Sequence, residues 1–449
     1  MSHGYLNHAR ALLVLGLPII GSHLAQMALH VTDTILLGRY SVDALAAVVI
    51  ATTSFFVVFI FGSGFAQAVM PLVAAALGRA DEAQVRRDAR MGMWLSLGFG
   101  LVTYPLFWTS GTWLLLLGQK PQVAALGQDF LRIAGWGMIP ALLVMALKGY
   151  LSALGRTQVL LWVTVAAVGL NLIIGWALIF GRWGMPEMGV RGAAIASVIV
   201  QFGTFGALAV YAGWVPELRK YHLFQRFWRP DWHALGQVFR LGWPIGVTGL
   251  AESGMFTACS LMMGWIGTVE LAAHGIAMEV SALTFMVHLG LSNAATVLTG
   301  RAEGAGDVRG LRDGALVAIG LSVGFGLLMV VVILSIPGPI LTLFIDARKP
   351  ETAQIVAFGS VLLVMAALFQ LTDAMQVMAL GLLRGIRDTK VPMIAAAVSY
   401  WLIGIPSSYV LAFNFGLGGV GLWLGLVVGL LAAASTMMWR FWHRAPKAA

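Results

Sequence analysis

The sequence predicts an all-α integral membrane protein, with twelve transmembrane helices in two six-helix lobes related by pseudo-two-fold symmetry along the membrane normal. Three observations predict this class. Apolar residues make up 59% of the chain and charged residues only 10%, whereas about a quarter of the residues in soluble proteins are charged. Long apolar runs alternate with short polar breaks. The first part of the sequence also returns, shifted by 226 residues, in the second part.

The apolar runs are long enough to cross a membrane. A spanning helix needs about 20 apolar residues, because the hydrocarbon core is roughly 30 Å thick and offers no water to unpaired backbone groups. The first run is too long for the apolar part of a signal peptide and contains Asp33, so we expect it to be retained. We expect helices over twelve runs, six in each half: 11–37, 44–77, 91–117, 123–153, 157–181, 189–214, 235–263, 268–300, 314–345, 354–383, 391–413 and 417–439.

The internal repeat relates the two halves. Residues 15–47 align without a gap with residues 241–273, and 26 of the 86 positions from residue 15 onward are identical. Chance would give roughly one in twelve. Because each half has an even number of spans, both halves enter the membrane in the same orientation, and the relating axis runs along the membrane normal. Pro18 and Pro244 are matched, and each is either a bend that moves or a static kink.

One long polar interval divides the chain. It covers residues 215–240 and separates a predicted N-terminal lobe, 1–214, from a predicted C-terminal lobe, 241–449. Aromatic residues alternate there with Arg and Lys, which favours a connector along the inner membrane surface with its aromatic side chains at headgroup depth. A partner-binding site is the alternative.

The basic residues predict the topology. Twenty of the 28 Lys and Arg fall on the side that holds both termini and six on the opposite side, which predicts a multi-pass protein of the cell inner membrane with cytoplasmic termini. This bias accounts for the net charge of +9, so we expect a lipid bilayer and no nucleic acid as partner. Arg132 and Lys148 lie inside the fourth run, where we expect them to pair with Asp129 or to extend to the interface. The six outer residues are Arg39, Lys120, Arg182, Arg191, Arg348 and Lys349.

Four carboxylates fall inside the predicted spans, namely Asp33, Glu252, Glu279 and Asp373. A charged carboxylate near the bilayer centre costs at least about 2.5 kcal/mol, so it usually marks a pathway, a partner or a bound ion. The alternative is a protonated carboxyl that hydrogen-bonds a neighbouring helix. The pattern favours the functional interpretation.

Two of these acids lie at different depths. Gln26 and Asp33 are seven residues apart, close to two helical turns, and therefore share a face. Glu252 and Cys259 occupy the same two positions in the repeat. The first lobe thus carries its acid about 10 Å further along its helix than the second. We expect both faces to point at one central cleft, in which the two acids form separate binding sites at different depths.

Other kinds of site are not indicated. His274 and His288 lie fourteen residues apart without a third ligand nearby, so we expect no metal. The single cysteine, Cys259, has no partner for an intrachain disulfide. No nucleophile, base and orienting group occur at identifiable positions, and no phosphate-binding glycine motif follows a strand. We therefore expect no cofactor and no enzymatic activity.

The chain resembles the multidrug and toxic compound extrusion (MATE) family over nearly its whole length, most closely the NorM-like bacterial branch. VTDTILLGRYSVDALAAV at 31–48 resembles the first-helix motif of this family. AAHGIAMEVSALTFMVHLGLSNAATVLTGRAEGAGD at 272–307 is similar to its eighth-helix stretch, and FQLTDAMQVMALGLLRGIRDTKVPM at 369–393 to its tenth-helix motif. The resemblance implies the twelve-helix, two-lobe fold.

The resemblance also implies roles for particular residues. Asp33 takes the place of the amino-lobe acid, Glu252 and Asp373 take the places of the carboxy-lobe acids of cation or proton binding, and Asn171 matches an amino-lobe asparagine. The sequence departs from the family at three positions, which lose two oxygen ligands and gain one carboxylate. This change favours protons over sodium. The departures are Gly175 for an Asn or Asp, Gly275 for a Gln, and Glu279 for an Asn.

We therefore expect a monomeric secondary active multidrug exporter. It would exchange inward-moving H⁺ or Na⁺ for amphipathic, often cationic small molecules by alternating access, with 21 Met, 23 Phe and 16 Trp available for adaptable cavity walls. A flippase for lipid-linked saccharides is the alternative, but its pyrophosphate substrate needs several cations, and only Arg132 and Lys148 remain in the spans. The expected substrate-cavity residues are Gln26, Asn171, His274, Met255 and Phe369.

Overall fold

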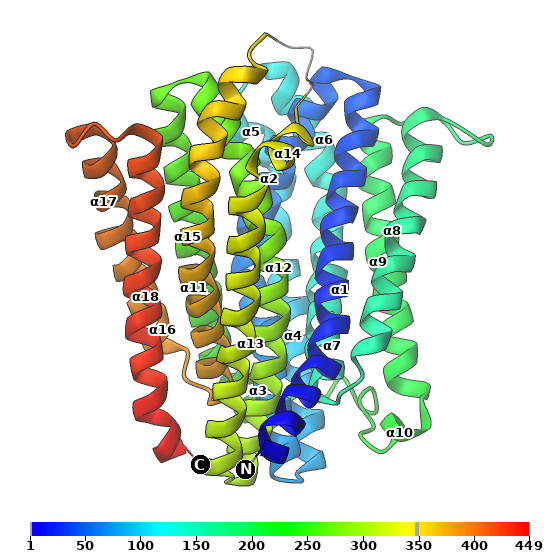
Figure 1. The fold of residues 1–449 in the computed structure, drawn as a ribbon. Helices are drawn as coiled ribbons and strands as arrows, with labels where there is room; N and C mark the ends of the chain where they lie inside the picture. Colours follow the sequence, from blue (N-terminus) through cyan, green and yellow to red (C-terminus); the bar gives the residue numbers. More distant parts are fainter. Residues whose placement is uncertain (1, 346–349, 449) are drawn as a thin grey trace. The chain divides into compact units, whose positions relative to one another are not determined.

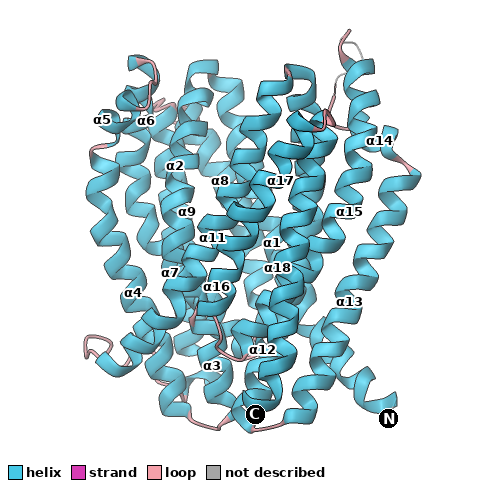
Figure 2. Ribbon diagram, turned by 90° about the vertical axis from the view of Figure 1, so that its left-hand side faces the viewer, coloured by secondary structure: helices cyan, strands magenta, loops and turns pink. Residues whose placement is uncertain are grey.

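The computed structural model describes residues 2–345 and 350–448, and all regular structure in these ranges is helical (Figures 1 and 2). The predicted outer residues Arg348 and Lys349 lie outside the described residues. All twelve predicted runs are covered by helical segments. Ten helical stretches are long and apolar enough to cross a membrane, and the other two runs are covered by helices of 27 and 35 residues.

The chain forms two compact units. The N-unit consists of Gly21–Gly246, and the C-unit consists of the residues up to Ile20 together with those from Val247 onward. Two helices therefore belong to both units: α1 (Ser2–Tyr40) and α11 (Trp232–Ile266). The points at which they change unit, after Ile20 and after Gly246, are 226 residues apart. The two helices therefore pass from one unit to the other at equivalent positions of the sequence repeat.

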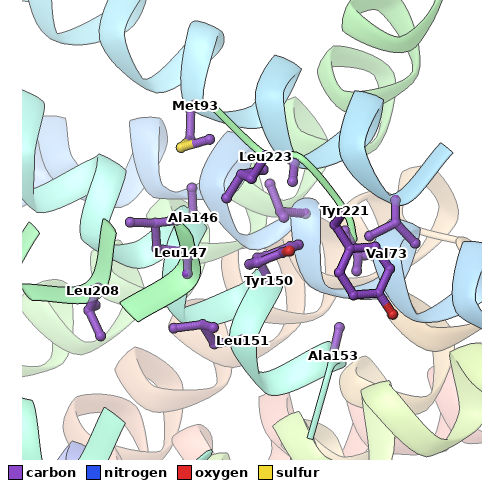
Figure 3. Close-up of a cluster of buried hydrophobic side chains, with 14 of the residues drawn as sticks. Val73, Met93, Ala146, Leu147, Tyr150, Leu151, Ala153, Leu208, Tyr221 and Leu223 are labelled. Atoms are coloured by element: carbon purple, nitrogen blue, oxygen red, sulfur yellow. The ribbon is translucent and has the colours of Figure 1, made fainter. Parts of the chain in front are cut away.

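The N-unit contains the helices between these two shared ones. Its core includes Tyr150 and Tyr221, whose rings meet edge to face at 6.4 Å between centroids (Figure 3). The helices of the N-unit are α2 (Val42–Gln67), α3 (Val69–Gly78), α4 (Glu82–Trp108), α5 (Ser110–Leu116), α6 (Pro121–Ala134), the 3₁₀ turn η1 (Gly135–Gly137), α7 (Met138–Ala153), α8 (Thr157–Phe180), α9 (Val190–Trp214) and α10 (Pro216–Arg219).

The C-unit is built around one central helix. In it, α15 packs against α12, α13 and α18. The tenth predicted run therefore meets the eighth, ninth and twelfth inside one unit, and the eleventh run packs against the twelfth. The helices of the C-unit are α12 (Thr268–Ala305), α13 (Val308–Ser335), α14 (Pro337–Thr342), α15 (Thr352–Gly385), α16 (Lys390–Ala397), the π-helix η2 (Val398–Gly404), α17 (Ile405–Tyr409), the π-helix η3 (Val410–Asn414) and α18 (Gly418–Ala448).

Equivalent capping residues begin equivalent helices. The Asp81 carboxylate accepts a hydrogen bond of 3.0 Å from the Gln84 backbone N–H at the start of α4. The Asp307 carboxylate does the same for the Gly310 N–H, at 2.8 Å, at the start of α13. A capping side chain satisfies a backbone donor that has no partner within the helix. The repeat in sequence is therefore also a repeat in local structure.

The polar interval is anchored on the N-unit. The Arg90 guanidinium donates hydrogen bonds to the carbonyl oxygens of His222, Leu223 and Gln225, and the Trp94 indole donates to the Phe227 carbonyl at 2.8 Å. Its residues Tyr221 and Leu223 are buried in the core (Figure 3). The helix predicted over residues 235–263 begins three residues earlier than expected, because α11 starts at Trp232 within the predicted connector.

Candidate functional site

The N-unit places one carboxylate against one amide. Asp33 lies on α1 and Asn171 on α8, and the Asn171 Nδ2 donates a hydrogen bond of 2.6 Å to the Asp33 Oδ1. Asn171 is fully buried and Asp33 is half-buried. The Asn171 Oδ1 is also buried and has no hydrogen-bond partner among the described residues. The pair therefore presents oxygen atoms that still need a donor or a cation.

Gly175 and Gln26 do not extend this pair. Gly175 lies one turn beyond Asn171 on α8, and a Cβ at Gly175 would lie 3.0 Å from the Leu36 Cδ1. Leu36 therefore fills the space that a longer polar residue at 175 would need. Gln26 is half-buried on α1, and within residues 2–345 and 350–448 it forms no hydrogen bond with Asp33. Among the described residues, the structure thus joins Asp33 with Asn171 and not with Gln26 or Gly175.

The C-unit brings two carboxylates together with a cation. Glu252 on α11 and Asp373 on α15 are close enough to interact electrostatically, as are Glu252 and Arg384, which also lies on α15. The Tyr400 hydroxyl in η2 interacts with all three. With both acids and Arg384 ionised, the cluster carries a net charge of −1.

The π-helix η2 positions Tyr400. The Gln376 Nε2 on α15 donates a hydrogen bond to the Tyr400 hydroxyl, and the next residue, Trp401, donates from its indole to the Ala251 carbonyl at 3.1 Å. Ala251 directly precedes Glu252. One irregular segment therefore contacts both helices that carry the acids, as π-helical turns at functional sites often do.

Unpartnered acceptors line this cluster. Gln370, Asp373 and Gln376 follow one another at three-residue spacing on α15, and all three are nearly or fully buried. Each has one side-chain oxygen without a hydrogen-bond partner in the described chain, and the Glu252 Oε1 is in the same condition. A buried acceptor without a donor costs about 1–3 kcal/mol. Such a group of oxygens can take a proton, a water molecule or a monovalent cation.

Sequence reasoning missed three members of the C-unit cluster. Arg384 was assigned to the cytoplasmic end of its span, and Gln376 and Tyr400 were not considered. Helical spacing could have found Arg384, because it follows Asp373 by eleven residues, about three turns, and so shares its face. Nothing in the sequence pattern of 398–404 indicates a π-helix.

Glu279 differs from the buried acids of the C-unit cluster in its exposure. Its side chain is exposed on α12 and forms no ion pair within the described part of the chain. Its expected part in ion coupling therefore remains a prediction that rests on its position in a span.

Three expected cavity residues lie in the interior of the C-unit. Met255, His274 and Phe369 are each at most 2% exposed. The Trp423 indole N–H donates to the His274 Nδ1 at 3.1 Å, so the other ring nitrogen carries the proton and donates to the Ser260 hydroxyl at 3.0 Å. Both ring nitrogens of His274 are therefore occupied by hydrogen bonds within the C-unit. The assignment of these three residues to a substrate cavity remains a prediction.

Neither basic residue of the fourth run pairs with Asp129 in the described part of the chain. Asp129 pairs with Arg191 at 3.0 Å. Arg132 donates to the Trp108 carbonyl at 3.0 Å and lies 4.4 Å from the centre of its indole ring. Lys148 donates to the Ser22 hydroxyl. Among the described residues, no three His, Cys, Asp or Glu side chains form a group that could hold a metal ion.

A twelve-span helical chain with acceptor-rich carboxylate sites inside its helices defines a membrane transport protein. Comparison with known proteins makes this class specific. The family model described as MatE matches residues 18–177 and 244–410. The chain belongs to the MatE family, which is a family of transporters and not of enzymes, as expected from the sequence.

Similar proteins cover nearly the whole chain. It is 47% identical over 436 residues to a protein of Rhizobium meliloti (strain 1021) named "Probable multidrug resistance protein NorM", which spans 97% of this chain and 93% of the relative. A protein of the same name from Agrobacterium fabrum (strain C58 / ATCC 33970) is 44% identical, over 98% of this chain and 95% of the relative. The resemblance to the NorM-like branch is confirmed.

A solved structure shares the fold. An outward-facing multidrug resistance MATE family transporter of the MOP superfamily superposes with a TM-score of 0.88 at 20% identity, over 98% of this chain and 96% of that one. The predicted fold class, twelve helices in two six-helix lobes, is therefore confirmed.

Proposed function

We propose that this protein is a secondary active multidrug exporter, which exchanges H⁺ or Na⁺ for amphipathic, often cationic compounds by alternating access. The observation that carries the proposal is the pair of carboxylate sites inside the spans, one in each unit, with buried oxygens that have no hydrogen-bond donor among the residues that the structure describes. The names of the curated relatives support multidrug resistance as the role of such a chain.

The C-unit cluster is suited to one monovalent cation. Glu252 and Asp373 contribute two negative charges and Arg384 one positive charge. One H⁺ or one Na⁺ then neutralises the cluster, which favours its transfer through a medium of low dielectric constant. Arg384 also repels a metal cation placed against Glu252. We therefore prefer a proton over sodium for this site.

The N-unit site is suited to binding a single proton, which changes the charge of Asp33 by one. Asp33 has one amide partner, and Gly175 supplies no further oxygen ligand. Three or more oxygens are usually needed to replace the water around a metal cation, whereas a proton needs one. When Asp33 binds a proton, it no longer attracts a cationic compound. Occupancy by one species then lowers the affinity for the other, and the two fluxes are linked reciprocally.

The membrane location and the topology are inferred from composition and charge. Ten apolar helices support a multi-pass membrane protein. The excess of Lys and Arg on the side of the termini supports an inner-membrane protein with cytoplasmic ends. We further propose that the protein acts as a monomer, because each carboxylate site is built within one unit of a single chain.

Charge-neutral variants test the role of the acids. Asp33→Asn and Asp373→Asn should remain in the membrane but lose gradient-driven efflux of a cationic dye such as ethidium by at least tenfold. Asp43→Asn is the matched control, because Asp43 is an exposed carboxylate at the start of α2. Unchanged efflux in correctly inserted Asp33 and Asp373 variants would remove these residues from the mechanism.

Proteoliposomes test the ion. Purified protein should release a preloaded dye under an imposed pH gradient and should respond weakly to an imposed sodium gradient of the same size. A response to sodium alone would overturn the preference for protons. Accumulation of a lipid-linked saccharide precursor in a deletion strain, with normal dye efflux, would support the flippase instead.

A further inference from the structure

α18 is the last helix of the chain (Figure 1), and its C-terminal end carries basic and aromatic side chains that the ion-coupling sites do not use. About 20 helical residues cross a hydrocarbon core of roughly 30 Å, at about 1.5 Å per residue. A span that begins with α18 at Gly418 therefore leaves the core near residue 438. Trp439 and the residues after it then lie at the depth of the lipid head groups.

Four of these side chains line a hollow at the surface of the C-unit. The hollow has a volume of about 270 Å³ and is lined by Trp439, Arg440, His443 and Arg444. Residues four apart in a helix are neighbours on its surface, so the tryptophan stands beside the histidine and one arginine stands beside the other. Two guanidinium groups and two aromatic rings thus surround one space.

One acid balances only half of the arginine charge. Asp388 lies in the connection between α15 and α16, and its Oδ2 accepts a hydrogen bond of 2.7 Å from the Arg440 Nε. The same oxygen lies 3.8 Å from the Arg444 Nε. Neither guanidinium has another ion-pair partner among the described residues, so the three groups carry a net charge of +1. The terminal N–H groups of both arginines form no hydrogen bond within the described part of the chain, and such groups bind phosphate oxygens in pairs.

The two aromatic rings of the hollow suit a membrane interface. The His443 Nδ1 lies 2.9 Å from the Trp439 carbonyl oxygen, and because a carbonyl can only accept, this ring nitrogen is the donor. The two rings lie 4.3 Å apart between centroids. Trp439 is 62% exposed. An exposed tryptophan at the end of a span places its apolar ring among the lipids and its N–H near the head groups.

An exposed and largely apolar face of α18 leads into the hollow. Val428 and Leu431 are 40% and 52% exposed, and Ser435 and Trp439 further along the helix are exposed as well. Spacings of three and four residues place these four side chains on one side of the helix, and His443 extends this side by one more turn. An apolar face that a spanning helix leaves uncovered is available to acyl chains. A head group in the hollow and chains along this face fit one lipid molecule.

We propose that this hollow binds the phosphate of an anionic phospholipid whose acyl chains lie along the exposed face of α18. A phosphate diester supplies one negative charge, which neutralises the net positive charge of Asp388 and the two arginines. Basic pockets at the ends of membrane spans suit such head groups. A zwitterionic lipid brings a further positive charge to a site that is already cationic, so the site should prefer phosphatidylglycerol over phosphatidylcholine. This lipid is a bound partner and not a transported compound, so the site does not depend on the proposed function.

Native mass spectrometry of the whole detergent-purified protein tests the site. Dioleoyl phosphatidylglycerol and dioleoyl phosphatidylcholine are titrated separately, and the wild type should bind its first phosphatidylglycerol about fivefold more tightly than its first phosphatidylcholine. Arg444→Gln removes one positive charge but keeps the Arg440–Asp388 pair, so the protein should fold. Its dissociation constant for phosphatidylglycerol should rise about fivefold, and that for phosphatidylcholine should change less than about twofold. Asp388→Asn removes the competing acid and should lower the constant for phosphatidylglycerol about twofold or more, a gain that a general loss of structure does not produce.

The controls separate this site from a general effect of charge. Arg309→Gln removes an exposed arginine from α13, also in the C-unit, and should leave both dissociation constants within about twofold of the wild type. Inorganic phosphate in excess should not displace the lipid, because the acyl chains contribute to binding. The proposal would be overturned by equal affinities of the wild type for the two lipids, or by displacement of the lipid by inorganic phosphate. It would also be overturned by an equal rise of the phosphatidylglycerol constant in Arg309→Gln and Arg444→Gln, or by a rise in Asp388→Asn.

Discussion

Gly64 of α2 and Gly290 of α12 occupy equivalent positions of the two repeats, and each lies against a helix that comes from the other half of the sequence. A Cβ at Gly64 would meet the backbone of Gly242 and Gly246 in α11. A Cβ at Gly290 would lie 3.0 Å from the Cα of Ile20 in α1. The part of α1 up to Ile20 therefore packs within the C-unit, and the part of α11 up to Gly246 packs within the N-unit. Each does so through one of two equivalent close contacts. Small residues permit this approach of membrane helices.

Substitution of these glycines should destabilise the protein. Gly64→Ala and Gly290→Ala place a methyl group against backbone atoms that cannot move aside as a flexible side chain can, and we expect a loss of about 1–3 kcal/mol each. Thermal unfolding of detergent-purified protein measures the effect. Gly169→Ala and Gly320→Ala are the controls, since nothing lies within 4 Å of a Cβ there. Equal unfolding temperatures in all four variants would contradict the close contact.

The matched prolines lie at the change of unit. Pro18 lies two residues before Ile20 and Pro244 two residues before Gly246. A proline removes one hydrogen bond of the helix and lowers its resistance to bending. Pro18→Ala and Pro244→Ala should therefore slow dye efflux several-fold with little loss of folded protein, as measured in proteoliposomes. Pro105→Ala, inside α4 of the N-unit, is the control. If all three variants transport at the wild-type rate, the prolines are static kinks.

Arg384 should stabilise the C-unit through Glu252. Removal of Arg384 takes away a positive charge that interacts with the Glu252 carboxylate, so the negative charge of this carboxylate is less well compensated. We expect a large drop in unfolding temperature for Arg384→Gln and partial recovery in the double variant with Glu252→Gln. Arg309→Gln, at an exposed position on α13, serves as the control. Additive effects of the two single substitutions would show that the side chains do not interact.

Arg90 should hold the segment after α10 in place. Its guanidinium donates to three carbonyl oxygens of that segment, so Arg90→Gln should free it without unfolding the spans. Trypsin should then cleave after Arg226 at least tenfold faster than in the wild type, as followed by gel electrophoresis. Arg86→Gln is the matched control on the same helix. Resistance of Arg90→Gln to trypsin would indicate that the core contacts of Tyr221 and Leu223 hold the segment alone.

The carboxylates could be found from the sequence because charged residues are rare within membrane spans. Asp33, Glu252 and Asp373 stand in apolar runs where a charge is costly, and the structure gives each of them polar neighbours in the interior of its unit. Asn171 became identifiable through resemblance to a family and not through its own pattern. Glu279 met the same sequence criterion as the others, but it lies exposed on α12.

The cavity residues could not be assigned in this way. Composition shows that Met, Phe and His are present, but it carries no information about which face of a helix a neighbour covers. His274 illustrates the difficulty, since its two hydrogen bonds come from Ser260 on α11 and Trp423 on α18, which are 14 and 149 residues away. No local pattern reports contacts of such sequence separation.

The sequence by itself determined the class of this protein, the number of spans, the repeat and the acids within the spans. These properties depend on hydrophobicity and periodicity, which act over a few neighbouring residues and are readable from the chain. Only the tertiary structure decided that α1 and α11 are shared between the units, that Arg384 and Tyr400 join Glu252, and that Lys148 donates a hydrogen bond to the Ser22 hydroxyl. The physical reason is that these relationships depend on which helix faces pack together, and packing joins residues that the sequence keeps far apart.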